Sequence, residues 1–305
     1  MKCIFIYNPN SGRGKIAKKL PYIVRKLKSG YAQVDVYATK AKGDLTVKVR
    51  EFASLYDCIV FSGGDGTFNE ILQGVGELDR LPIFGYIPGG TANDVAHSLG
   101  IPRRSLRGAL GVILKGRREF LDCMRINGRE YAMYSVSAGA FTSASYTTPQ
   151  QAKRALGLLA YGMEGVRKNL PFRVYPVRVT DETSCTETEC VFTLIINGKC
   201  VAGWKMNRNG SMRDGKAEGA IVRQTAHPNL YNKARALLAI VRLFVFGYRF
   251  PEKDIEHFGG KKLRIDVPED VVWNYDGEKG SAGPIEIEVL PKKFPLLVPK
   301  NNKNI

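Results

Sequence analysis

The first third of the chain alternates between short β-like runs and runs with helical spacing, and this alternation most restricts its fold. The apolar runs Cys3–Tyr7, Asp57–Phe61 and Ile83–Ile87 have the length and composition of buried strands, and Gln33–Ala38 alternates as a strand does. Parallel strands need crossover connections, usually helices, so this order predicts an α/β fold with a mostly parallel sheet and helices on both faces. The helix-like segments are Arg13–Lys28, Leu45–Leu55, Phe68–Leu72 and a short helix that ends near Leu99.

The rest of the chain has a different pattern, in which short β-like runs are separated by Gly, Asn and Asp turns. This pattern is typical of an antiparallel sandwich or barrel, and two helices interrupt it at about Gln150–Lys168 and Tyr231–Phe246. At about 150 residues per domain, 305 residues predict two domains: an α/β domain over 1–121 and a β-sandwich over 122–290, followed by a segment 291–305. The expected strands are Cys123–Ile126, Tyr131–Val136, Arg173–Val179, Val191–Asn197, Ala220–Val222, Leu263–Val267 and Ile285–Val289.

Charge restricts the partners of such a protein without choosing one of them. The chain has 46 Lys and Arg against 29 Asp and Glu, a net charge of +17 that is spread over both halves. An excess of this size suggests nucleic acid, an anionic membrane surface or phosphorylated small molecules. An RNP signature, zinc-finger spacing and a basic leucine zipper are all absent, so nothing besides charge supports nucleic acid.

The distribution of apolar residues argues against a membrane-spanning chain. The longest apolar stretch, Ala236–Gly247, is interrupted by Arg242 and is shorter than the roughly 18 residues needed to span a bilayer. The opening run Cys3–Tyr7 is too short for the core of a signal peptide. Six scattered cysteines without a CxxC pair are typical of reduced thiols. We therefore expect a cytoplasmic protein without a transmembrane segment.

Three loops in the first domain follow a strand and precede a helix: Asn8–Gly12, Ser62–Thr67 and Pro88–Asp94. In a parallel sheet all three lie at the carboxyl edge of the strands, where ligands bind. Their glycines let backbone N–H groups approach phosphate oxygens closely, and the start of the following helix favours negative charge. Each loop alone could be a tight turn, but three at successive strand ends predict a phosphate-binding site.

Two familiar phosphate-binding signatures are absent. The segment Gly12–Lys15 is followed by Ile16 where a P-loop has Ser or Thr, and its glycine spacing also differs. Gly64 and Gly66 lack the third glycine of the dinucleotide fingerprint, because Asn69 stands in its place. The loops therefore predict neither a Walker nucleotide fold nor an ordinary NAD-binding domain.

Taken together, these residues resemble the catalytic domain of the diacylglycerol kinase family, and in particular its soluble bacterial lipid kinases. The resemblance covers nearly the whole chain. It implies a Rossmann-like domain of the NAD kinase and diacylglycerol kinase type, followed by a β-sandwich, with ATP and the lipid hydroxyl in the cleft between them. It also implies that the last segment can return to the first domain. The matching segments are Asn8-Pro-Asn-Ser-Gly12, Gly63-Gly-Asp-Gly-Thr-Phe-Asn69, Pro88-Gly-Gly-Thr-Ala-Asn-Asp94, Ala138-Gly139, Leu156-Gly157, Ala160-Tyr161, Asp214-Gly215 and Tyr275-Asp-Gly-Glu278.

The resemblance implies roles for individual residues. Asp65 and Asp94 would hold the catalytic Mg²⁺, partly through water, since hard cations take oxygen ligands. Glu278 would accept the proton of the lipid hydroxyl as that oxygen attacks the γ-phosphorus of ATP. The residues that would contact ATP are Asn8, Pro9, Asn10, Ser11, Gly12, Thr39, Gly63, Gly64, Asp65, Gly66, Thr67, Phe68, Asn69 and Thr91.

A second, structural Mg²⁺ is implied in the second domain. It would be held by Asp214 and by the carbonyls of Ser211 and Lys216, although Asn207–Met212 departs from the usual family sequence. The sequence leaves open whether this site is filled and whether the chain forms a homodimer.

Several of these residues have simpler interpretations. Asp65 and Asp94 could cap helices, a role that can coexist with metal binding. Glu278 outside its motif would be interpreted as a solvated surface residue. The segment Tyr231–Phe250 combines an apolar stripe with basic residues and could lie on a membrane, but packing against the sandwich is favoured. His257 is expected in a turn before two glycines.

The leading hypothesis is a kinase that uses ATP and Mg²⁺ to phosphorylate a lipid hydroxyl, that of diacylglycerol first, and works at the anionic inner face of the membrane. The alternatives are another substrate (a sphingoid base, undecaprenol, phosphatidylglycerol or NAD) or a non-catalytic lipid-binding relative. Intact Asp65, Asp94 and Glu278 argue against the non-catalytic alternative. An NAD kinase would not be expected to carry Asn8–Gly12 or the Asp-Gly-Glu sequence near the end.

Overall fold

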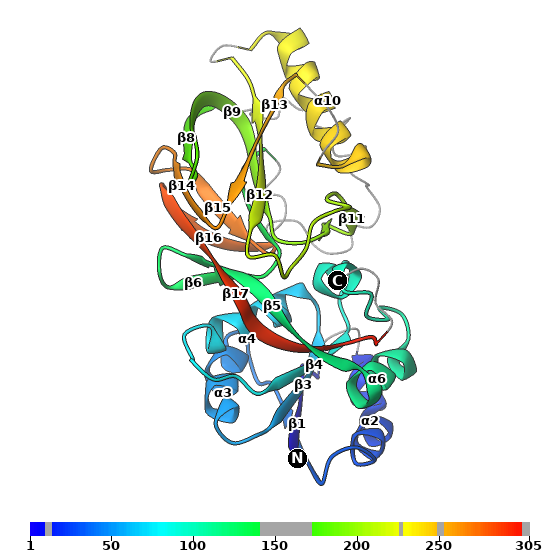
Figure 1. The fold of residues 1–305 in the computed structure, drawn as a ribbon. Coiled ribbons are helices and arrows are strands. Elements are labelled where there is room, and N and C mark those ends of the chain that lie inside the picture. Colours follow the sequence, from blue (N-terminus) through cyan, green and yellow to red (C-terminus); the bar gives the residue numbers. More distant parts are fainter. Residues whose placement is uncertain (10–13, 141–172, 226–227, 249–252, 301–305) are drawn as a thin grey trace.

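The computed structural model places a parallel sheet in the first half of the chain (Figure 1). β1 (Lys2–Tyr7) pairs in parallel with β2 (Gln33–Ala38) on one side and with β3 (Cys58–Gly63) on the other, and β3 pairs with β4 (Ile83–Pro88). The predicted strands and their parallel arrangement are therefore confirmed. The structure describes residues 1–9, 14–140, 173–225, 228–248 and 253–300.

Helices cover both faces of this sheet, because side chains along each strand alternate between two apolar clusters. From β1, Ile4 packs in the cluster that contains Val49, whereas Phe5 packs in the cluster that contains Ile23. The described helices are α1 (Lys15–Lys18), α2 (Leu20–Leu27), α3 (Asp44–Ala53), α4 (Asp65–Val75), α5 (Asp94–Ser98), α6 (Leu106–Lys115) and α10 (Leu230–Phe246).

Helix boundaries differ from the sequence prediction in two places. The predicted helix Arg13–Lys28 is divided into α1 and α2, and Pro21 lies in the first turn of α2, where a missing N–H is tolerated. α6 is not among the predicted helices, because Gly108 and Gly111 lower its helix propensity. The predicted helix Gln150–Lys168 lies outside the described residues.

Antiparallel strands form the second half, as predicted. They continue the same sheet in the order β16-β15-β7-β9-β8-β14, and β12 pairs with β9 and β13. Their inward side chains form a core around the fully buried Trp273. The strands are β5 (Arg117–Ile126), β6 (Glu130–Ala132), β7 (Ser135–Gly139), β8 (Tyr175–Thr180), β9 (Cys185–Ile196), β10 (Cys200–Val201), β11 (Trp204–Lys205), β12 (Ala217–Arg223), β13 (Ile255–Gly260), β14 (Lys262–Asp266), β15 (Val272–Tyr275) and β16 (Glu278–Ala282).

One long strand, β17 (Ile285–Val298), passes through both halves (Figure 1). It pairs with β14 at its beginning, with β5 along most of its length, and in parallel with β4 near its end, where Leu296 lies opposite Phe84. The predicted strand Ile285–Val289 is only the first part of it. The expected boundaries after residues 121 and 290 fall within β5 and β17, and residues 291–298 lie beside the first sheet.

The turn predicted at His257 is wrong, because His257 lies in β13 opposite Ala220 of β12. The following glycines suggested a turn, but they belong to the strand. A Cβ atom on Gly259 would lie 2.7 Å from the carbonyl oxygen of Ala217. Here glycine allows the close approach of two strands.

The helix α10 confirms the predicted segment Tyr231–Phe246 and begins one residue earlier. Its Ala236, Ile240 and Leu243 side chains are buried in the core, so one face packs against the strands. None of the helices in the described part of the chain is both long and apolar enough to cross a bilayer.

Candidate active site

The loops after β3 and β4 pack directly against one another at the carboxyl edge of the sheet. The N–H of Gly89 donates to the carbonyl of Gly63 over 2.7 Å. A Cβ atom on Gly90 would lie 2.6 Å from the Cα of Gly64, which is too close for any side chain. Since only glycine fits where the loops cross, two of the predicted phosphate-binding loops form one unit.

Asp65, at the start of α4, holds these two loops together. Its carboxylate accepts the N–H of Asn93 at 2.8 Å and the N–H of Asp94 at 2.7 Å. Asn93 has a positive φ of 51°, and its side-chain oxygen accepts the N–H of Gly90 at 2.9 Å. Burial raises the pKa of Asp65, although these N–H groups favour its charged form. Asp65 thus caps the backbone at the start of α5 from a neighbouring loop.

Asp94 is almost completely buried, and its surroundings come from both halves of the molecule. One carboxylate oxygen accepts the N–H of Gly203 at 2.6 Å, across 109 residues of sequence. Burial, and secondarily the nearby charge of Asp65, raise the pKa of Asp94 to about 7. Gly203 lies at the tip of the β10–β11 hairpin, where Ala202 and Gly203 both have positive φ. The sequence analysis did not identify Gly203, because only its Ala-Gly turn is visible in the sequence.

Asp276 is a third buried carboxylate, and it fixes the turn between β15 and β16. It accepts the N–H groups of Met133, Tyr134 and Ser135 at 2.6, 2.9 and 3.0 Å. The side-chain amide of Asn69, a predicted ATP contact on α4, donates to the same carboxylate over 3.3 Å and so faces the second half. Burial raises the pKa of Asp276 to about 6. The sequence analysis quoted Asp276 within its motif but gave it no role; its signal was the Asp-Gly turn.

The turn fixed by Asp276 carries Glu278 to the first half of the molecule. A Cβ atom on Gly66 would lie 2.9 Å from a carboxylate oxygen of Glu278, so Glu278 lies beside the first turn of α4. Its other oxygen lies 3.0 Å from the ammonium of Lys42, and the two side chains are 43% and 82% exposed. This hydrogen bond raises the pKa of Lys42. Lys42 was not predicted, although it lies shortly after Thr39, which the resemblance places at the nucleotide.

The other predicted ATP contacts have different surroundings. Phe68 is fully buried, and its ring packs against Phe61 and Phe294, so its side chain belongs to the core. The N–H of Thr39 donates to the carbonyl of Tyr7 over 2.9 Å, which places Thr39 beside the end of β1. Exposed or half-buried positions at the same edge are occupied by Asn8, Pro9, Gly64, Gly66, Thr67 and Thr91. Asn10, Ser11 and Gly12 lie outside the described residues.

The residues expected at a second metal site form a turn before β12. The Asp214 carboxylate accepts the N–H of Lys216 at 3.2 Å, and the Ser211 hydroxyl oxygen accepts the N–H of Arg213 at 3.1 Å. The buried Asp122, which the sequence analysis missed, lies behind this turn and accepts the N–H of Gly215 at 2.7 Å.

A magnesium ion fits the donor set around Asp65 and Asp94. Asp94 is buried and Asp65 is half-buried, and desolvation raises the pKa of each carboxylate, so a nearby divalent cation would compensate their charge. The described residues contain no group of three or more His, Cys, Asp or Glu that could hold a metal. Mg²⁺ commonly uses one or two carboxylates and completes its shell with water and phosphate oxygens, which matches this pair.

Comparisons with known proteins agree with this geometry. Residues 2–126 match the model of the diacylglycerol kinase catalytic domain. A diacylglycerol kinase of Bacillus subtilis strain 168 is 30% identical over 297 residues, which cover 97% of this chain and 95% of that protein. A diacylglycerol kinase of Staphylococcus epidermidis is 29% identical over 298 residues, covering 97% of this chain and 92% of that protein.

Solved structures show the same relationship. A Bacillus anthracis structure assigned to the diacylglycerol kinases superposes with a TM-score of 0.82 at 28% identity and covers 97% of this chain and 95% of that chain. A second diacylglycerol kinase from the same organism superposes with a TM-score of 0.77 at 25% identity and covers 97% and 96%. The chain therefore belongs to the diacylglycerol kinase family, a family of lipid kinases.

Proposed function

We propose that this protein transfers the γ-phosphate of ATP to the hydroxyl of diacylglycerol, giving phosphatidic acid. The observation that best supports this proposal is the position of Glu278, which reaches from the second half to Gly66 in the glycine-rich loop of the first. In the proposed complex, this carboxylate would meet the acceptor hydroxyl at the end of the bound triphosphate. The relatives named above support diacylglycerol as the acceptor.

In the proposed complex, backbone groups bind the phosphates. The first N–H groups of α4, including those of Gly66 and Thr67, have no carbonyl partner within the helix and suit phosphate oxygens. The contact between Gly64 and Gly90 fixes the two loops before ATP arrives, so little reorganisation is needed on binding. Thr91 is exposed beside this contact and would donate its hydroxyl.

Asp65 and Asp94 would hold the catalytic Mg²⁺, in part through water. When bound, this ion neutralises phosphate charge as the phosphoryl group transfers. The backbone N–H groups on Asp65 and Asp94 keep both carboxylates in place. A structural Mg²⁺ at Asp214 and the carbonyls of Ser211 and Lys216 is part of the same proposal.

Glu278 would act as the general base. It would accept the proton of the lipid hydroxyl while the hydroxyl oxygen bonds to the γ-phosphorus and ADP leaves. Asp276 holds the turn from which Glu278 projects, so the base is positioned by three backbone hydrogen bonds. The Lys42 ammonium lies 3.0 Å from Glu278 as an exposed partner of this carboxylate.

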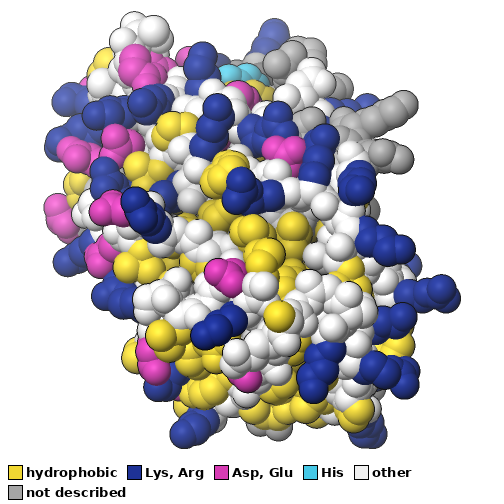
Figure 2. All heavy atoms as spheres, turned by 60° about the horizontal axis from the view of Figure 1, so that its bottom comes forward, with side chains coloured by type: hydrophobic (Ala, Val, Ile, Leu, Met, Phe, Trp, Pro, Cys, Tyr) yellow, Lys and Arg dark blue, Asp and Glu magenta, His cyan; other side chains and the backbone are white. Residues whose placement is uncertain are grey.

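We further propose that the protein works from the cytoplasm at the inner face of the membrane. Its net charge of +17 favours an anionic surface, and each well-placed basic residue contributes about 1 kcal/mol there. Figure 2 shows Lys and Arg side chains scattered over the visible face and outnumbering Asp and Glu.

The test is an assay with labelled ATP and a total lipid extract, followed by identification of the labelled product. We expect labelled phosphatidic acid, and we expect pure diacylglycerol in neutral detergent micelles to give the same product. Another labelled product would show that a different compound is the substrate. These products are sphingoid-base phosphate, undecaprenyl phosphate, phosphorylated phosphatidylglycerol and NADP. A folded protein that binds ATP but labels no lipid would identify a non-catalytic relative and end the proposal.

A further inference from the structure

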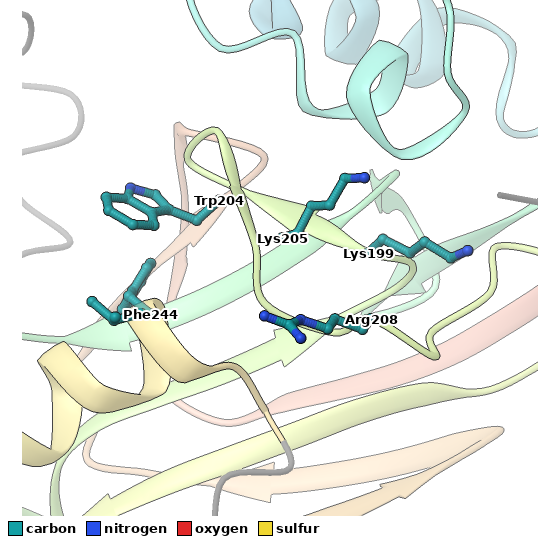
Figure 3. A pocket seen from close by; sticks show the side chains of 6 residues that line it. Lys199, Trp204, Lys205, Arg208 and Phe244 are labelled. Carbon is teal, nitrogen blue, oxygen red and sulfur yellow. The ribbon is translucent and has the colours of Figure 1, made fainter.

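A pocket of about 540 Å³ lies between the β10–β11 hairpin and the last turn of α10 (Figure 3). In Figure 3 the rings of Trp204 and Phe244 lie beside one another and Arg208 points toward them, while Lys199 and Lys205 extend away from the rings. We call it the basic pocket, and its lining residues are Lys199, Trp204, Lys205, Arg208, Phe244 and Val245.

The backbone around the basic pocket is fixed by hydrogen bonds. The N–H of Asn207 donates to the carbonyl of Lys199 over 3.1 Å, and the N–H of Tyr248 donates to the carbonyl of Met206 over 2.6 Å. Gly247 has a φ of 95°, and a Cβ atom on it would lie 2.5 Å from the carbonyl oxygen of Met206. The end of α10 is therefore held against the loop that carries the basic side chains.

The cations of the basic pocket have no carboxylate partner within the described part of the chain. Among the described residues, no carboxylate forms an ion pair with Lys199, Lys205 or Arg208. Burial, and secondarily the nearby Lys205, lower the pKa of Lys199, which marks an environment unfavourable to a lone positive charge. An anion with several oxygens would relieve this repulsion and is the ligand that Lys and Arg side chains at one pocket favour.

Exposed apolar side chains continue from the basic pocket along α10. Tyr231, Leu238 and Val245 are spaced seven residues apart, so they share one face of the helix, and their exposed fractions are 67%, 46% and 43%. Trp204 is 43% exposed and Phe246 is 56% exposed at the same end. A small anion in water needs the cations but gains nothing from this apolar surface, whereas a membrane lipid needs both.

We propose that the basic pocket binds the phosphate of an anionic phospholipid while Trp204 and the exposed face of α10 contact the lipid surface. Diacylglycerol carries no charge, so the three cations select a lipid other than the proposed substrate. The site goes beyond the proposed function, since binding there needs neither ATP nor diacylglycerol. Because Gly203 donates its N–H to Asp94, the hairpin that lines the pocket also contacts the candidate active site.

The intrinsic fluorescence of the protein allows a direct test. The chain has two tryptophans, of which Trp273 is completely buried in the second core and Trp204 is exposed beside the pocket. The protein is titrated, without ATP, with vesicles of phosphatidylcholine alone or of phosphatidylcholine with about one-third phosphatidylglycerol. We expect a blue shift with the anionic vesicles only, and its absence in Trp204→Phe.

Two triple variants separate the pocket from overall charge. K199Q/K205Q/R208Q should weaken vesicle binding about a hundredfold, since each basic residue contributes about 1 kcal/mol, or about fivefold. The control R25Q/K26Q/K28Q removes the same charge from exposed positions on and just after α2, and should weaken binding less than tenfold. Circular dichroism and the Trp273 emission confirm that both variants remain folded.

Four results would overturn the proposal. Equal losses in the two triple variants would show a general charge effect, and an unchanged Trp204 emission on bound vesicles would place the contact elsewhere. Inorganic phosphate that displaces the vesicles at low concentration would show a site for soluble anions. A dimer by light scattering that Leu238→Glu dissociates, with vesicle binding intact, would assign the α10 face to a second copy. Failure of the kinase assay alone leaves this binding test unaffected.

Discussion

The β10–β11 hairpin contacts Asp94 and also lines the basic pocket, but the charges of the buried carboxylates and of the pocket have different kinds of partner. Asp65, Asp94 and Asp276 each accept backbone N–H groups at 2.6–3.0 Å, and Asp94 and Asp276 are also buried. Lys199 and Lys205 are paired with no carboxylate among the described residues and line an open pocket. Backbone contacts fix the positions of the carboxylates, whereas unpaired side chains can adapt to a variable surface.

The largest effect should follow from Glu278→Gln, which keeps the shape of the side chain and removes the base. We expect a loss of about 10²- to 10⁴-fold in kcat for lipid phosphorylation in neutral micelles, with ADP affinity unchanged. The control Lys42→Met removes only the exposed partner of Glu278, so its rate should change by about threefold or less. A Glu278→Gln enzyme with the native rate would remove Glu278 from the mechanism.

Asp276→Ala tests whether the turn that carries Glu278 depends on a buried carboxylate. It leaves the N–H groups of Met133, Tyr134 and Ser135 without their acceptor, so we expect a loss of about 3 kcal/mol or more in the free energy of unfolding. Asp276→Asn keeps one acceptor oxygen, so its free energy of unfolding should lie between those of the native protein and of Asp276→Ala. Denaturant titration followed by Trp273 emission measures both, and equal stability of all three proteins would contradict this role.

Gly90→Ala tests whether the crossing of the two loops is as close as the structure has it. The new methyl group would meet the Cα of Gly64 at 2.6 Å, so we expect a loss of about 2 kcal/mol in stability and weaker ATP binding. Gly111→Ala is the matched control, because a Cβ atom there meets nothing within 4 Å in the middle of α6. It should stabilise the protein by up to about 1 kcal/mol. Similar effects of the two substitutions would contradict a close crossing.

The pH dependence of stability should report the buried carboxylates and not the basic pocket. Asp94 has a pKa of about 7 in the folded protein against an ordinary value of 3.8, so the folded state retains a proton that the unfolded chain has lost between these values. Its contribution to stability is therefore lost as the pH rises from about 4 to 7 in metal-free protein. Asp94→Asn should flatten this decline, and Mg²⁺ with ATP should reduce it in the native protein.

Denaturant titrations at several pH values, with EDTA or with Mg²⁺ and ATP, measure the decline. An identical slope in Asp94→Asn would show that other groups cause it. K199Q/K205Q/R208Q should leave the slope as it is, which separates the two regions.

Local patterns in the sequence predict most of the first half but not the contacts that assemble the site. Alternation of strands and helices predicts β1 to β4, and their glycine-rich ends predict the loops that meet at Gly64 and Gly90. The hydrogen bonds from Gly203 to Asp94 and from Met133 to Asp276 join residues 109 and 143 positions apart. Nothing in their local sequence marks these pairs, because their distances are set by the packing of whole strands.

The path of β17 has a consequence for the order in which the molecule can be completed. The catalytic-domain match ends at residue 126, but the second neighbour of both β4 and β5 is β17, in residues 285–298. During synthesis, the β4 edge of the first sheet therefore stays without its β17 neighbour until residues 285–298 have left the ribosome. The sheet that carries the predicted phosphate-binding loops is therefore completed only by a strand that follows the whole antiparallel half in the sequence.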